Sequence, residues 1–280
     1  MSLQLAEVSP GQLEVRQPDG RPLFRYVYQP DVPERESPRP YMHPLYSVDG
    51  DALTNFRPND HPWHHGLSLT VTSIDGLNFW GGPSYRRGEG YQWRQDHGVQ
   101  KHREWRSQKG DHLEHVLDWR GVQAAQPLVK EVRSVRVSLV EDGWSLAWRS
   151  ALQNVSGRPL TCHNYHSIGG LEGSHYTGLQ FRGARALLDE HGDDTIGIRG
   201  EDGVKNDAAH GQRSRWLEWH TQHDTTLRRT KVRFESAEPV YWFLRRSLPL
   251  VSFAFHRDEA FVLEPDATLV LEQRLTFTRM

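Results

Sequence analysis

Cysteine is almost absent from this sequence, with Cys162 the only one among 280 residues. One cysteine excludes a disulfide within the chain and a cluster of thiolate metal ligands. Cys162 is followed by His163, as in a nucleophile pair, but neighbouring side chains on a strand face opposite ways. We therefore interpret Cys162 as a buried, inert thiol.

Long apolar runs and blocks of like charge are also lacking. No run approaches the roughly 18 apolar residues that a membrane-spanning helix needs, and the N-terminal segment has no basic stretch followed by an apolar one. The 34 basic and 36 acidic residues are interspersed and give a formal net charge of −2. We therefore expect a soluble, cytoplasmic protein with neither a nucleic-acid nor a membrane partner.

What the chain does contain is alternation of apolar and polar residues with the period of a strand. Segments 131–140 and 144–148 both alternate, and they flank Asp142-Gly143. Two such runs around an Asp-Gly pair predict a β-hairpin, with Trp144 and Trp148 in the core.

Segments 111–121 and 268–277 alternate in the same way, whereas helical periodicity is scarce. Turn residues recur throughout, and no shift in composition marks a domain boundary. The sequence thus predicts an all-β fold, a large antiparallel β-sandwich formed by residues 1–280 as a single domain. Within it, Asp189 to Ser214 is predicted to be a long loop or an excursion at the edge of the sheet because it is rich in Gly, Asp and His.

The stretch NDHPWHHG, residues 59–66, places three histidines between two segments typical of strands. Loops held by a rigid scaffold commonly carry functional sites. His64 and His65 are neighbours, so on an extended chain only one of them faces a given partner. The alternative is that these histidines only hydrogen-bond the backbone of a proline-containing turn.

A second histidine cluster, in LTCHNYHSIGGLEGSHYTG, contains His163, His166 and His175. Histidine exchanges protons near neutral pH, which makes it suitable for general acid and base catalysis. The catalytic candidates are His64, His65, His163 and His166. A pocket for a polyol also needs aromatic walls and a few oriented polar groups, and the candidates for these roles are Arg57, Asp60, Trp63, Trp80, Tyr165, Glu172, Tyr176, Arg182, Trp242 and Arg245.

Several segments resemble the PmoA-like family, whose label names a methane oxygenase. These are RPYMHPLYSVDG, TNFRPNDHPWHHGLSLTVTSIDGLNFW, GSHYTGLQFRGAR, PVYWFLRR and EPDATLVLEQRL. Trp63 stands where that family often has another histidine. The oxygenase activity that the label names is not supported by this sequence, because a membrane-embedded subunit needs spanning segments.

A fainter resemblance links the chain to the galactose mutarotase-like supersandwich of aldose 1-epimerases. DHPWHHG, LTCHNYHSIGGL and VLEPDATLVLEQRLTF occur in the order of that family's two histidine motifs and closing strand. The resemblance implies that His64 or His65, together with His163, acts on a sugar ring oxygen. It also implies a glutamate base, for which Glu235, Glu238 and Glu259 are the candidates, none of them in a matching motif.

Three functions follow as alternatives. The first is a carbohydrate-active enzyme, an epimerase, lyase or hydrolase that needs no cofactor and uses the histidines as acid and base. The second is a metal-dependent enzyme, in which zinc, iron or copper is bound by His61, His65 and His163, or with Glu172 in place of His163. The third is a non-catalytic carbohydrate-binding protein. The expected partner is a small carbohydrate, and a homodimer is a further expectation because sandwich enzymes of this size are often dimeric.

Overall fold

A computed structural model describes residues 2–192 and 195–280. Over these residues the fold is all-β, and in the described part of the chain fifteen strands form one antiparallel sheet. Thirteen of them follow one another in this spatial order: β1 (Gln4–Ser9), β2 (Gln12–Arg16), β3 (Pro22–Val27), β4 (Tyr41–Leu45), β5 (Leu67–Thr70), β14 (Gly178–Arg182), β18 (Leu250–Ala254), β17 (Arg229–Arg245), β20 (Thr268–Arg279), β12 (Gly143–Asn154), β11 (Val129–Val140), β10 (His112–Gly121) and β9 (Gly98–Lys109).

The remaining strands are attached to this sheet or lie beside it. β16 (Arg213–Gln222) pairs with β17, and β15 (Gly197–Gly200) pairs with β16. Two small sheets are formed by β19 (Phe261–Leu263), β13 (Leu160–His163) and β6 (Ser73–Ile74), and by β7 (Ser84–Arg86) with β8 (Gly90–Gln92). The described helices are single 3₁₀ turns at Glu34–Glu36, Arg185–Leu187, Glu201–Gly203 and Asn206–Ala209. No helix among the described residues has the length and apolar character to cross a membrane.

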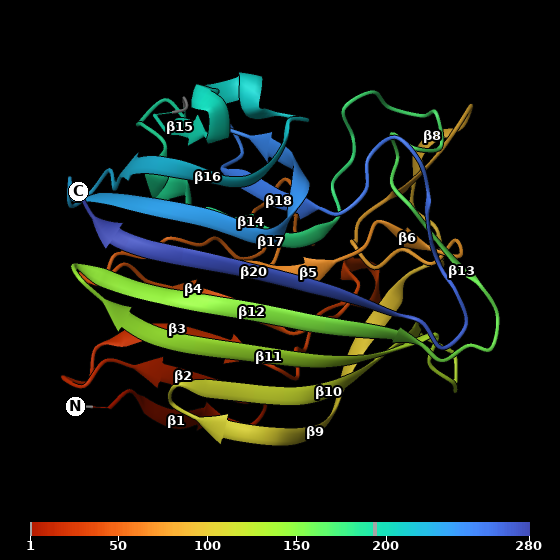
Figure 1. The fold of residues 1–280 in the computed structure, drawn as a ribbon, viewed down its shortest axis with the longest axis horizontal. Helices are drawn as coiled ribbons and strands as arrows, with labels where there is room; N and C mark the ends of the chain where they lie inside the picture. The colour runs from red at the N-terminus through yellow and green to blue at the C-terminus, as the bar shows by residue number, and fades with distance from the viewer. Residues whose placement is uncertain (1, 193–194) are drawn as a thin grey trace.

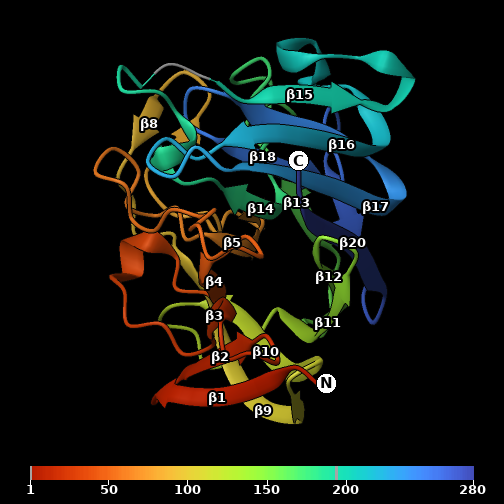
Figure 2. The same ribbon diagram turned by 90° about the vertical axis from the view of Figure 1, so that its left-hand side faces the viewer.

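The large sheet curls until its two outermost strands become neighbours. Figure 2 shows β1 and β9 side by side at the bottom, with the other strands rising along both sides. The approach is close, since a Cβ added to Gly110 would lie 2.4 Å from the carbonyl oxygen of Leu3. The core lies between the two sides: the ring of Phe24 on β3 stacks 5.9 Å from that of Trp144 on β12. The predicted all-β antiparallel sandwich is therefore confirmed.

The predicted hairpin is present as β11 and β12, which pair from Val129 with Asn154 to Val140 with Gly143. Asp142 has a positive φ of 56° at the turn, as the Asp-Gly pair predicts. Trp144 and Trp148 are buried in the core as expected. The segment from Asp189 to Ser214, predicted to be a long loop or edge excursion, contains two 3₁₀ turns and β15, which pairs with β16 at an edge of the sheet, and it runs into β16. Residues 193 and 194 of that segment, and residue 1 of the predicted domain, lie outside the described residues.

A polar network crosses the apolar core. Arg133 on β11 donates Nε and Nη2 to Glu131 at 2.8 Å, and both side chains are fully buried. The Arg133 Nη1 donates to the hydroxyl of Tyr26 on β3, at 3.3 Å, which links the two sides of the sandwich. Burial alone would lower the pKa of Arg133, but the Glu131 carboxylate and the Tyr26 hydroxyl raise it overall.

Candidate functional site

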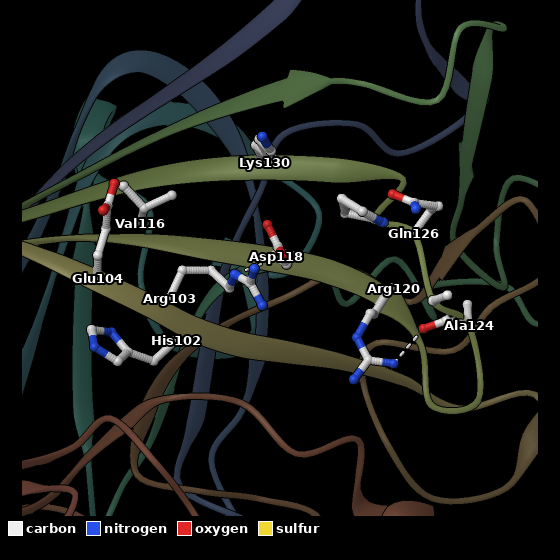
Figure 3. Close-up of a pocket in the computed structure, with 11 residues that line it drawn as sticks. His102, Arg103, Glu104, Val116, Asp118, Arg120, Ala124, Gln126 and Lys130 are labelled. Carbon is white, nitrogen blue, oxygen red and sulfur yellow. Dashed lines mark hydrogen bonds and ion pairs between the residues drawn. The ribbon is translucent and has the colours of Figure 1, made fainter.

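A wide concavity of about 740 Å³ lies over β9, β10 and β11 (Figure 3). Three of its charged groups are engaged with their own surroundings: Arg103 Nε lies 3.2 Å from Asp118 Oδ2, and Arg120 donates to the carbonyl oxygens of Gly121, Val122 and Ala124. None of the residues predicted to form a site lines it. These side chains support the β9–β11 surface and the turn after β10.

A second pocket, of about 420 Å³, contains the candidate site. It forms where the NDHPWHHG loop, between β4 and β5, meets β8, the segment before β14, and the turn from β17 to β18. The β7–β8 hairpin extends beyond the end of the large sheet in Figure 1. The aromatic walls are Trp63, Trp80, Tyr91, Tyr176 and Phe243. The polar residues are His61, His64, Ser174 and Arg245, and Gly81, Pro83, Leu248 and Leu250 complete the lining.

Three rings of the aromatic wall pack against one another in sequence. The ring centroids of Trp80 and Tyr176 lie 4.4 Å apart, and Tyr176 is 5.2 Å from Phe243. The hydroxyl groups of Tyr91 and Tyr176 are 2.8 Å apart. Burial raises the pKa of both phenols, that of Tyr176 well above its ordinary value. Both tyrosines are therefore neutral hydroxyl donors.

His61 and His64 lie side by side in this pocket, with ring centroids 4.9 Å apart. The Nδ1 of His61 lies 2.8 Å from Asp60 Oδ2. Because an ionised carboxylate only accepts, Nδ1 carries the proton and Nε2 holds the lone pair. Burial tends to raise the pKa of Asp60, but the hydrogen bond from His61 lowers it overall. Asp60 thus remains ionised and orients the His61 ring.

His64 is 3% exposed, and its side chain has no hydrogen-bond partner among the described residues. Burial, followed by the charge of Arg182, lowers its pKa well below the ordinary value. The ring is therefore neutral and offers one donor and one acceptor. Since buried polar atoms are normally hydrogen-bonded, an unpaired imidazole in a pocket indicates a place for a ligand atom.

His65 faces the opposite side of the loop. Its Nε2 lies 3.1 Å from Glu36 Oε2, in fully buried surroundings. Arg57 donates Nε and Nη2 to the same carboxylate, at 3.0 and 2.8 Å. Burial lowers the pKa of His65 to about 4, so the neutral ring donates its Nε2 proton to Glu36. His65 and Arg57 therefore fasten the loop rather than face the pocket.

Trp63 is held in place from two directions. The buried guanidinium of Arg39 donates Nη2 to the Trp63 carbonyl oxygen at 2.7 Å. On the other side the indole packs on Gly82, where an added Cβ would lie 2.4 Å from Trp63 Cε2. Gly82 also has a positive φ of 74°. This part of the wall therefore depends on the absence of a side chain at Gly82.

The second histidine cluster does not reach the pocket with the residues proposed as catalytic. His163 lies on β13, opposite Ser73 of β6 in the small sheet. His166 has its Nε2 3.1 Å from Asp258 Oδ1, and its Nδ1 accepts from the Gly173 N–H at 3.1 Å. Neither lines the pocket. The cluster contributes Ser174 and Tyr176 instead.

The predicted metal ligands are likewise separated. His61 lines the pocket, His65 is bonded to Glu36 behind the loop, and His163 lies on β13. Across residues 2–192 and 195–280, no group of three His, Cys, Asp or Glu side chains is placed to hold a metal ion.

The other proposed substrate-binding residues take different places. Trp80, Tyr176 and Arg245 line the pocket. Tyr165 packs behind the wall, 5.6 Å from Tyr176, and Arg182 donates to the Leu248 carbonyl oxygen at 2.6 Å. Glu172 is exposed and does not line the pocket.

Trp242 is a correction, because its side chain belongs to the core. It is 1% exposed, and its Nε1 donates to Ser214 Oγ at 2.7 Å. Side chains alternate along β17, so the adjacent Phe243 faces the pocket and Arg245 shares its side.

The residues that form or support the site but were not predicted from the sequence include Glu36, Arg39, Tyr91, His210 and Phe243. Alternation along 241–245 is the signal that would have found Phe243. Glu36, Arg39, Tyr91 and His210 are single residues in segments without a motif, so no sequence signal marks them.

Comparison with protein families gives one match, to a family of unknown function over residues 14–279. The chain belongs to the DUF6807 family. The PmoA-like family suggested by the sequence is not shown by this match. No curated protein matches this DUF6807 protein.

Comparison with solved structures finds distant matches, among them the following two. One is a polysaccharide lyase, at a TM-score of 0.37 and 8% identity over 99% of this chain; the DUF6807 chain spans only 32% of that lyase. Another is a galactose mutarotase-like protein from Clostridium acetobutylicum, at a TM-score of 0.41 and 11% identity, covering 100% of this chain and 99% of the other. Any function must therefore be argued from the pocket itself.

Proposed function

We propose that the pocket binds a carbohydrate and that His61 acts on it as a general base. The observation that carries the proposal is the combination of aromatic walls with two imidazoles, one oriented by Asp60 and one without a partner. Flat rings suit the apolar faces of sugars, and a few polar groups then fix orientation. The volume of about 420 Å³ is within the ordinary range for small-molecule pockets.

The two histidines have different roles in this proposal. His61 presents an unprotonated Nε2, and Asp60 stabilises the imidazolium that forms when this atom takes a proton from a sugar hydroxyl. His64 has too low a pKa to store a proton near neutrality, so it binds the ligand as a neutral hydrogen-bonding group. The proposed base is thus His61, which was predicted from the sequence only as a metal ligand. His65 holds the loop that carries His61 by its hydrogen bond to Glu36.

The test is to incubate the protein with neutral and acidic mono- and disaccharides and to follow binding by calorimetry and conversion by NMR. His61→Gln should retain affinity and lose turnover by roughly 10²–10⁴-fold, as expected for a general base. His64→Gln should mainly weaken binding. His220→Gln is the matched control, since His220 hydrogen-bonds Glu218 on its own strand and does not line the pocket.

Failure to bind any sugar in the panel would contradict the proposed ligand class. Binding without turnover, or full turnover in His61→Gln, would contradict the catalytic role and leave a carbohydrate-binding protein.

A further inference from the structure

The charge of the pocket is one-sided. Arg245 is the cation among its described lining residues, and no Asp or Glu lines it. Arg245 makes no ion pair with a carboxylate within the described part of the chain. Its hydrogen-bond partners are the Leu244 carbonyl oxygen, at 2.9 Å, and the ring of His210. Burial lowers the pKa of Arg245, because a guanidinium charge is less stable when it is partly removed from water. A half-buried guanidinium without a counter-charge indicates that the counter-charge comes with the ligand.

The edge of Arg245 that carries Nε and Nη2 is the edge left open. The hydrogen bonds that Arg245 makes with the described residues all use Nη1. Elsewhere in the chain, Arg57 binds Glu36 and Arg133 binds Glu131 through Nε and Nη2 together. This two-point geometry matches the planar carboxylate. Arg245 thus offers the pocket the same edge that two other arginines use on carboxylates.

The guanidinium is fixed in position before any ligand arrives. Its carbon lies 4.5 Å from the ring centroid of Phe243, which shares its side of β17. The Nδ1 of His210 lies 3.3 Å from the Leu244 N–H and 3.2 Å from Arg245 Nη1. The His210 Nε2 lies 3.1 Å from the Gly173 carbonyl oxygen. A carbonyl only accepts and an amide only donates, so His210 is neutral, with its proton on Nε2 and its Nδ1 accepting from Arg245.

We infer that this pocket selects an acidic sugar, a uronate, whose carboxylate is bound by the Nε and Nη2 of Arg245. The inference rests on the proposed carbohydrate function and names its substrate class. Tyr91 and Tyr176, whose hydroxyl groups form a pair in the same lining, add a donor for the anion or a neighbouring hydroxyl. His210 is a positioning residue, since it orients the guanidinium without lining the pocket.

The experiment compares affinities by calorimetry for methyl glycosides of galacturonate, glucuronate, their methyl esters, galactose, glucose and galactose 6-sulfate. The unchanged protein should bind the uronates at least 10-fold more tightly than the esters and neutral sugars. This comparison requires no substitution in the protein. Arg245→Gln should remove this preference, a loss of roughly 10- to 100-fold for the uronates, with neutral sugars unchanged. Arg245→Lys keeps the charge but loses the two-point geometry, so it should restore only part of the preference.

Two variants test the positioning role and one is the control. His210→Leu should weaken uronate binding alone, and His210→Gln should recover most of it because the amide keeps an acceptor. Arg213→Gln removes another arginine over an aromatic ring, Tyr241, outside the pocket, and should change nothing.

The outcomes separate this inference from the proposed function. Equal binding of uronates, esters and neutral sugars overturns the inference and leaves carbohydrate binding intact. Preference for the sulfate over the uronates overturns the assignment to a carboxylate. Absence of binding to every sugar overturns both.

Discussion

The buried pair of Glu131 and Arg133 gives the sharpest stability prediction. Glu131→Gln keeps the shape of the side chain and removes its charge, which leaves the fully buried Arg133 guanidinium without a counter-charge. The same carboxylate also accepts from Trp119 Nε1, at 2.7 Å, and from the Ser150 hydroxyl. Removing one partner of a buried ion pair typically costs about 3–5 kcal/mol. We therefore expect the free energy of unfolding to fall by that amount, a large part of the total for an ordinary domain.

Urea unfolding followed by tryptophan fluorescence measures this change. With a slope of about 3 kcal/mol per molar urea, the midpoint should fall by roughly 1 M or more. The control is Glu272→Gln, which breaks an exposed pair with Arg149 and should cost less than about 1 kcal/mol. A second variant, Glu131→Leu with Arg133→Met, replaces both charges by apolar groups and should recover most of the loss. If Glu131→Gln is no more destabilising than Glu272→Gln, the network does not hold the two sides of the sandwich as described.

Three further predictions concern the pocket loop and single buried groups. Gly82→Ala should displace the Trp63 indole and weaken ligand binding. Gly88→Ala is the control, because Gly88 also has a positive φ but faces open space, and it should leave binding unchanged. Equal loss of binding in both variants would mean that backbone strain alone causes the loss. Burial lowers the pKa of His65 to about 4, so the unfolded state takes up its proton first and stability falls with pH from about 6.5 to 4. Between pH 7 and pH 5 the loss of folding free energy due to His65 amounts to about 2 kcal/mol. The urea midpoint should therefore change less with pH in His65→Gln than in the unchanged protein. The same pH dependence in both proteins would refute this role of His65. Burial raises the pKa of Cys162 to about 12, so a thiol reagent should label the protein only in urea, and rapid labelling of the native protein would contradict the structure.

Much of the fold could be predicted because alternation is a local signal. Alternation along segment 111–121 places Leu113, His115, Leu117 and Trp119 on one face of a strand, and all four are buried. The hairpin at Asp142 followed from turn chemistry. Between Asp189 and Ser214, composition predicted a loop or edge excursion but not the short strand β15, which is stabilised by pairing with β16. Such pairing involves residues distant in sequence, which composition does not report.

The site could be located from the sequence, but its members could not be assigned. The NDHPWHHG loop does line the pocket, through His61, Trp63 and His64. Which side each residue faces depends on partners such as Glu36, which lies far away along the chain and belongs to no motif. His163 and His166 were grouped with this loop by residue type, and His163 also by the mutarotase resemblance, yet strand pairing and Asp258 hold them elsewhere.

The meeting of β1 with β9 has a consequence for how the protein avoids self-association. The outer edge of an open sheet exposes unpaired N–H and C=O groups to which another chain can add a strand. Here the two outermost strands of the curled path lie against each other, with Gly110 close to the Leu3 carbonyl, so each hinders access to the other. This protection joins segments about a hundred residues apart, so it forms only when both ends of the path are in place. Until then the N-terminal strands and β9 are the parts of the chain most open to aggregation.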